Sequence, residues 1–137
     1  MRAWGQRSEV EGGNRLDLRV PAVPSMAAEV RRAFGALPIP PRILDDARLL
    51  VNELVTNSIR HAGLHSGDQI RVRAEWTGTR LRVDVIDGAR VAARGAVAGA
   101  IRPVPEAESG WGLYLVECLA TRWGRGLGRY WFELDRE

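Results

Sequence analysis

The sequence of 137 residues contains no lysine, one cysteine and two histidines. A single cysteine excludes an intrachain disulfide and a zinc site built from cysteines. No apolar run reaches the roughly 20 residues of a membrane-spanning helix, and residues 1–7 lack the apolar stretch of a secretory signal. The 45% hydrophobic content excludes wholesale disorder. We therefore expect a soluble cytoplasmic protein that binds no membrane.

Because lysine is absent, all twenty basic residues are arginines. The formal net charge is only +3, yet the pI is about 9.9, because a guanidinium group keeps its proton at any ordinary pH. Nucleic-acid-binding proteins usually concentrate basic residues on one face or helix. Here the arginines are spread from Arg2 to Arg136, so we expect no direct contact with nucleic acid.

The hydrophobic pattern predicts short strands alternating with helices. Strands are expected at residues 15–20, 70–76, 81–85 and 130–134, where apolar and polar side chains alternate. Helices are expected from a Ser25 cap to Phe34, at 42–62 with Gly63 as the stop, and at about 110–121. Hairpin strands with polar outer faces need helices to cover the inner face. This predicts an α+β fold, a two-layer α/β sandwich whose mixed, mostly antiparallel sheet has helices on one face.

The remaining segments predict the domain organisation. Residues 1–13 are polar and glycine-rich and predict a flexible N-terminal tail, which leaves 14–137 as a single domain. Residues 88–109 show no clean period, and a stretch of this length inside a compact domain predicts a functional loop or lid. The glycine-rich stretch 124–128 lies between two strand-like segments, and a hairpin turn is preferred there over a phosphate loop.

A polar stripe runs along the longest expected helix. Glu53, Asn57 and Arg60 stack on one side, because helix positions three, four and seven apart are neighbours. An amide oxygen can ligate Mg²⁺, and a carboxylate can accept the proton of a hydroxyl. The alternative is a solvated helix face on which Glu53 pairs with Arg60.

Two glycine-containing turns offer further ligand-binding positions. Asp87 ends an expected strand, and Gly88 lets the backbone approach a ligand closely; the alternative is an ordinary Asp-Gly turn. Gly110 and Gly112 at a helix start leave backbone N–H groups open to an anion. The alternative for these two glycines is a flexible hinge.

Together these segments resemble a known family. The order Glu53-x-x-x-Asn57, Asp87-Gly88 and Gly110-x-Gly112-Leu113 resembles the N, G1 and G2 boxes of the GHKL-type (Bergerat) ATP-binding fold. Gyrase, heat-shock chaperones, histidine kinases and mismatch-repair ATPases share this fold. The stretches Glu-Leu-Val-Thr-Asn-Ser-Ile-Arg-His at 53–61, Trp-Gly-Leu at 111–113 and Tyr-Trp-Phe-Glu-Leu at 130–134 are similar to the actinobacterial anti-sigma factor/serine-protein kinase branch. The resemblance covers about residues 15–135.

The resemblance implies a role for each matching residue. Asn57 would hold Mg²⁺ through its side-chain oxygen, and Glu53 would be the catalytic carboxylate that orients or deprotonates the attacking hydroxyl. Asp87 would accept the adenine amino group. The other implied ATP-binding residues are Gly88, Gly110, Gly112, Leu113 and Arg60. The implied chemistry is phosphoryl transfer by positioning and charge neutralisation.

The resemblance also implies a function in transcription regulation. The chain would be an ATP- and Mg²⁺-dependent serine/threonine-protein kinase and anti-sigma factor. It would phosphorylate a STAS-type anti-sigma factor antagonist and sequester a sigma factor, and the resemblance leaves a homodimer open, since relatives are often dimers. The alternative is a catalytically weak, nucleotide-responsive scaffold in the same type of switch. The Glu53/Asn57 pair favours the enzyme, whereas Ala89-Arg90, in place of a further glycine after Gly88, favours the scaffold.

Three other features have simpler interpretations. His61 and His65 lie four apart, but Gly63 is expected to end the helix between them, so no metal site is expected. Cys118 is expected to pack among apolar neighbours. The arginines of the central hairpin share one outer sheet face with two acidic residues: Arg71, Arg73, Arg80 and Arg82, with Glu75 and Asp84. A solvated face is preferred there over a docking surface.

Overall fold

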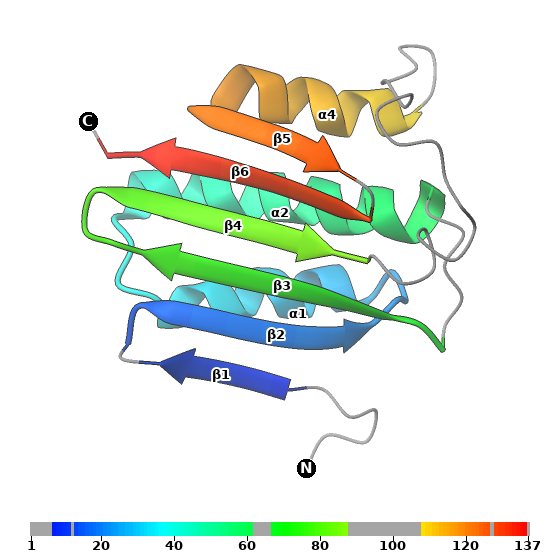
Figure 1. The fold of residues 1–137 in the computed structure, drawn as a ribbon, viewed down its shortest axis with the longest axis horizontal. Helices are drawn as coiled ribbons and strands as arrows, with labels where there is room; N and C mark the ends of the chain where they lie inside the picture. Colours follow the sequence, from blue (N-terminus) through cyan, green and yellow to red (C-terminus); the bar gives the residue numbers. More distant parts are fainter. Residues whose placement is uncertain (1–6, 12, 62–66, 88–107, 127, 137) are drawn as a thin grey trace.

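The computed structural model describes residues 7–11, 13–61, 67–87, 108–126 and 128–136, with side chains placed for 13–60, 67–87, 113–126 and 128–136. In these residues, six strands form one sheet in the order β1-β2-β3-β4-β6-β5. Helices α1, α2 and α4 lie on one face of it (Figure 1). The expected two-layer α+β sandwich is confirmed. The sheet, expected to be mixed and mostly antiparallel, is antiparallel at every pairing of the described strands.

The strands follow the alternation of the sequence. Their bounds are β1 (Arg7–Glu11), β2 (Arg15–Pro21), β3 (Gln69–Trp76), β4 (Arg80–Ile86), β5 (Arg122–Gly126) and β6 (Arg129–Asp135). In β4, for example, Leu81, Val83 and Val85 are fully buried against the helices, whereas the residues between them face outward. Burying one such side chain stabilises the fold by about 1.5–3 kcal/mol. The period-two pattern therefore decides which face of the sheet the helices cover.

The helices bury their apolar sides on this face. Their bounds are α1 (Met26–Ala33), extended by the 3₁₀ turn η1 (Phe34–Ala36), then α2 (Pro41–His61) and α4 (Glu108–Leu119). Helix α2 begins at Pro41, a position where the missing N–H of proline costs nothing. It buries Ala47, Val51 and Leu54 at helical spacing. No helix in the described ranges combines the length and apolarity needed to cross a bilayer.

Two expectations for the N-terminal part were wrong. Residues Arg7–Glu11, expected within a flexible tail, form β1 and pair with β2. The pairing satisfies backbone groups that the edge of β2 would otherwise leave open. Ser25 stands at the N-cap of α1 without a side-chain capping bond. Backbone bonds from the N–H groups of Met26 and Ala27 to the carbonyls of Val23 and Pro24 replace it.

One expectation for the C-terminal part was also wrong. Cys118 is exposed, because the buried side of α4 is set by Leu113 and Val116 and a residue two positions further points away. The hairpin expected at 124–128 is present, because β5 and β6 pair antiparallel, but its turn is shorter than expected, since 124–126 belong to β5. A Cβ on Gly124 would lie 2.7 Å from Trp131 Nε1, so glycine lets the Trp131 ring pack across β5.

The segments that carry the predicted site residues lie at one end of the strands. The C-terminal end of α2, the ends of β4 and β5, the start of β6 and the N-terminal end of α4 lie at the same end of the molecule (Figure 1). Of the loop or lid expected at 88–109, residues 88–107 lie outside the described residues, as do Gly63 and His65, whereas 108–109 belong to the first turn of α4.

Candidate functional site

Asn57 lies near the C-terminal end of α2, and a contact with β6 holds its side chain in place. Its side chain is 7% exposed, and its Nδ2 donates a hydrogen bond to the Tyr130 hydroxyl at 3.2 Å. This bond fixes the direction of the amide. It leaves Asn57 Oδ1 buried with no hydrogen-bond partner.

Asp87 is placed by the neighbouring strand end. Its backbone N–H donates to the Gly128 carbonyl at 2.9 Å, and Gly128 has a φ of 70°, a conformation that glycine adopts without strain. The carboxyl is 6% exposed, and its Oδ1 has no hydrogen-bond partner. Burial raises the pKa of Asp87, and the nearby Ser58 hydroxyl and the Asp87 backbone oppose this shift.

The partnerless buried polar atoms gather in one place. In the described side chains, four such atoms are found: Asn57 Oδ1, Ser58 Oγ, Asp87 Oδ1 and Arg125 Nη1. Tyr130 connects them, because it contacts Asn57, pairs with Arg125 across β5 and β6, and has a pKa that responds to both Asp87 and Arg125. Buried polar atoms normally have partners. Four partnerless buried polar atoms around Tyr130 therefore indicate a site that can bind a polar ligand.

The electrostatics of the cluster fit a ligand that has a hydrogen-bond donor at one end and a negative charge at the other. Burial raises the pKa of Tyr130; nearby Arg125 lowers it, and the Asp87 carboxyl raises it. The Tyr130 hydroxyl therefore stays protonated at neutral pH and can accept from Asn57 while keeping its own proton to donate. An acceptor at Asp87 and a cation at Arg125 suit a donor group and an anion, respectively.

The other residues named from the sequence divide into three groups. Glu53 is half-buried one turn before Asn57 on α2, and Arg60 is exposed one turn after it. Leu113 is buried in the core from α4. Gly110 and Gly112 lie within the first turns of α4, at the same end of the molecule as Asn57 and Asp87 (Figure 1). Gly88 lies outside the described residues.

Sequence reasoning missed three members of the cluster. Ser58 lies on the buried side of α2, where it is 1% exposed, and the sequence pattern assigns no role to its hydroxyl. Tyr130 was assigned only as an apolar position of a strand, and Arg125 was assigned to a turn. Two signals pointed to them: a hydroxyl on the buried side of a helix, and an arginine in register with the buried positions of a strand.

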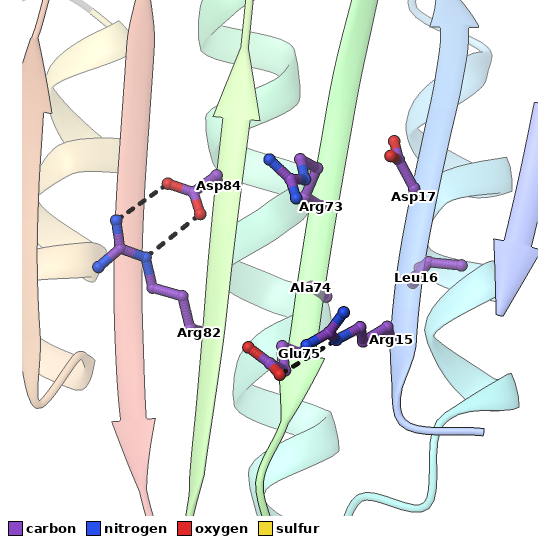
Figure 2. Close-up of a pocket in the computed structure, with 8 residues that line it drawn as sticks. All are labelled: Arg15, Leu16, Asp17, Arg73, Ala74, Glu75, Arg82 and Asp84. Atoms are coloured by element: carbon purple, nitrogen blue, oxygen red, sulfur yellow. Dashed lines mark hydrogen bonds and ion pairs between the residues drawn. The ribbon is translucent and has the colours of Figure 1, made fainter. Parts of the chain in front are cut away.

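The outer face of the sheet offers a different kind of hollow. A pocket of about 280 Å³ lies there, lined by Arg15, Leu16, Asp17, Arg73, Ala74, Glu75, Arg82 and Asp84 (Figure 2). Its carboxylates are already engaged: Glu75 by Arg15 and Asp84 by Arg82. None of the partnerless buried atoms of the described side chains lies in this hollow. It resembles a solvated sheet face, and we place the candidate site on the helix-covered side.

The donor set of the cluster suits Mg²⁺ shared with a ligand. Within the described residues, no three His, Cys, Asp or Glu side chains gather as a metal site. The free amide oxygen of Asn57 is a hard oxygen donor. Mg²⁺ usually takes few protein ligands, with phosphate groups and water completing its shell. The site therefore fits a magnesium ion that arrives with a phosphate-bearing ligand.

The comparison with protein families agrees with this geometry. The family of the histidine kinase-like ATPase domain matches residues 16–125, a range that includes Asn57, Asp87 and most of the sheet. No curated protein matches the chain. Because the match spans well over half of the sequence and the fold is the one expected for a GHKL-type ATP-binding domain, the chain belongs to the histidine kinase-like ATPase domain family.

Proposed function

We propose that the chain is a cytoplasmic anti-sigma factor with serine-protein kinase activity that binds ATP and Mg²⁺. It phosphorylates an anti-sigma factor antagonist and sequesters a sigma factor. The observation that carries the nucleotide-binding part is the group of four partnerless buried polar atoms around Tyr130. The kinase and anti-sigma parts are supported by the similarity of residues 53–61, 111–113 and 130–134 to that branch of the family.

The Asp87 end of the cluster suits adenine. The exocyclic amino group of adenine is a donor, and the adjacent ring nitrogen is an acceptor. Asp87 Oδ1 offers an acceptor, and the Ser58 hydroxyl can donate. Guanine would place a carbonyl oxygen opposite the carboxylate, an unfavourable pairing of two acceptors. The site therefore favours ATP over GTP.

The α2 end of the cluster suits the phosphates and their cation. Asn57 Oδ1 would hold Mg²⁺, which would supply positive charge to neutralise the phosphates. Glu53 lies one helical turn before Asn57, so the two side chains share a side of α2. Its carboxylate would accept the proton of an incoming serine hydroxyl. Gly110 and Gly112 would present N–H groups at the start of α4.

Nucleotide titration and phosphoryl transfer test this proposal together. Calorimetric titration with ATP, ADP and GTP, with and without Mg²⁺, should show adenine preference and magnesium dependence. Radiolabelled transfer from ATP to a STAS-type antagonist of the same organism should label one serine, with the serine-to-alanine antagonist as the control. Co-purification with sigma factors of the same organism tests sequestration. A protein that binds ATP but labels no antagonist would support the scaffold alternative instead of the kinase.

A further inference from the structure

Arg125 is the arginine of β5 that faces the helices, on the same side of the strand as Trp123. The neighbours of β5 on β6 fix its direction: Arg122 is opposite Glu133 and Gly126 is opposite Arg129, both outward positions. Arg125 is opposite Tyr130, whose hydroxyl reaches Asn57 on α2. Arg125 therefore extends from the edge strand towards the candidate site rather than towards the outer face.

One nitrogen of the Arg125 guanidinium is buried without a hydrogen-bond partner. Its Nη1 is buried and makes no hydrogen bond, and arginine cannot escape the cost of burial by losing its proton. The other inward-facing charge of the cluster, Asp87, does not pair with it, because β6 lies between β4 and β5 in the sheet. Arg125 as a whole is half-buried, but its buried nitrogen without a partner is costly, and an anion that binds there would compensate it.

We propose that Arg125 binds the phosphate groups of the nucleotide, an inference that rests on the proposed function of the same site. Asp87, directly after β4, and Arg125 on β5 flank Tyr130 on β6. A ligand lying across Tyr130 would meet an acceptor at one end and a cation at the other. Adenine nucleotides have this polarity, with a donor amino group on the base and anionic phosphates at the far end.

The position of α4 agrees with this assignment. Its N-terminal end lies at the same end of the molecule as the end of β5 (Figure 1), and a helix N-terminus favours anions. A planar guanidinium can also bind two phosphate oxygens at once. Arg125 would thus complete, from the sheet side, the anion site that the glycines of α4 begin.

Binding of three ligands that differ only in phosphate content tests the proposal. Wild type, Arg125→Ala, Arg125→Gln and Arg125→Lys are titrated calorimetrically with adenosine, ADP and ATP in the presence of Mg²⁺. Arg122→Ala is the matched control, because Arg122 is on the same strand but pairs with Glu133 and Asp135 on the outer face. Thermal melting checks that each variant folds, and the glutamine variant keeps most of the side-chain volume if alanine does not.

The expected result is a loss that depends on phosphate. Arg125→Ala and Arg125→Gln should weaken ADP and ATP binding by about ten- to a hundredfold, the effect of one charged hydrogen bond. They should leave adenosine binding unchanged, Arg125→Lys should recover part of the loss, and Arg122→Ala should change nothing. If adenosine and ATP binding weaken equally, or if ATP binding is unchanged, the phosphate-binding role of Arg125 is wrong, and the proposed function is not affected. A wild type that binds none of the three would overturn the proposed function and this inference with it.

Discussion

Asn57 Nδ2 and the Tyr130 hydroxyl lie 3.2 Å apart and join α2 to β6 across the edge of the sandwich. The two residues are 73 positions apart in the sequence, and the bond decides which atom of the Asn57 amide remains available. Because the nitrogen is engaged, the oxygen is the free atom. Tyr130 therefore orients the amide of Asn57, the residue that we propose as the Mg²⁺ ligand.

Removing the Tyr130 hydroxyl should weaken the magnesium dependence of nucleotide binding. In Tyr130→Phe the ring remains, but Asn57 loses the acceptor that orients its amide, so Oδ1 is no longer fixed. We expect ADP affinity in Mg²⁺ to fall about three- to tenfold, the effect of one neutral hydrogen bond, with little change in EDTA. Calorimetric titration under both conditions measures this. An equal loss in EDTA would contradict the positioning role.

Replacing Asp87 should separate stability from binding. Burial raises the pKa of Asp87 above 3.8, so the folded protein holds this proton more tightly than the unfolded chain. The ionised carboxylate therefore opposes folding at pH 7, and this penalty disappears as the pH falls through the raised value. Asp87→Asn should raise the melting temperature of the ligand-free protein at pH 7 by a few degrees. The gain over wild type should shrink as the pH approaches 4.

The same Asp87→Asn variant should bind ADP about ten- to a hundredfold more weakly, because a charged hydrogen bond to the amino group is lost. Asp17→Asn is the control: Arg71 lowers the pKa of Asp17, so this change should lower the melting temperature at pH 7 and leave ADP binding intact. Differential scanning calorimetry and ADP titration provide the two readouts. An Asp87→Asn protein that binds ADP normally would remove Asp87 from the adenine pocket.

Alanine substitutions at Glu53 and Asn57 should differ in their effects on nucleotide binding and phosphoryl transfer. Glu53→Ala should leave nucleotide binding nearly intact and cut phosphoryl transfer by about a hundredfold or more, the usual effect of a positioned general base. Asn57→Ala should impair both, because the phosphates lose the side chain that holds their cation. Radiolabelled transfer to the antagonist, run beside ATP titrations, compares the variants. Transfer by Glu53→Ala at the wild-type rate would refute the general-base assignment and leave the kinase proposal standing.

Glu133 should stabilise the outer face of the sheet in a pH-dependent way. Its carboxylate accepts from Arg122 at 2.6 Å and from Arg82 at 3.2 Å, and the bond from Arg122 is the main reason that its pKa is lowered from 4.5. A lowered pKa contributes stability that is complete above about pH 4.5 and is lost as the pH falls through the folded value.

Glu133→Gln should therefore lower the melting temperature by a few degrees at pH 7, and the difference from wild type should vanish at low pH. Glu75→Gln is the control, because Glu75 has a more exposed pair with Arg15 and exposed pairs contribute little. Melting curves from pH 2.5 to 7 measure both variants. A Glu133→Gln deficit that persists unchanged at pH 2.5 would show that packing, not charge, is responsible.

The layers of the fold and the order of the motifs can be predicted from local sequence patterns. Alternation such as Leu81-x-Val83-x-Val85 predicts a strand with one buried face, and the helical period of Ala47, Val51 and Leu54 predicts the helix that covers it. Both patterns are local, because the side chains that share a face are two to four residues apart. The Glu53/Asn57 pair could be predicted for the same reason.

Strand register and helix packing determine which polar groups share the candidate site. Arg125 and Tyr130 meet because β5 and β6 pair in one register, and shifting that register by one residue would turn Arg125 to the outer face. Asn57 and Asp87 join them because α2 packs across the sheet at the edge where β4 ends. Such contacts depend on strand register and helix packing between residues up to 73 positions apart, and no local periodicity in the sequence encodes them.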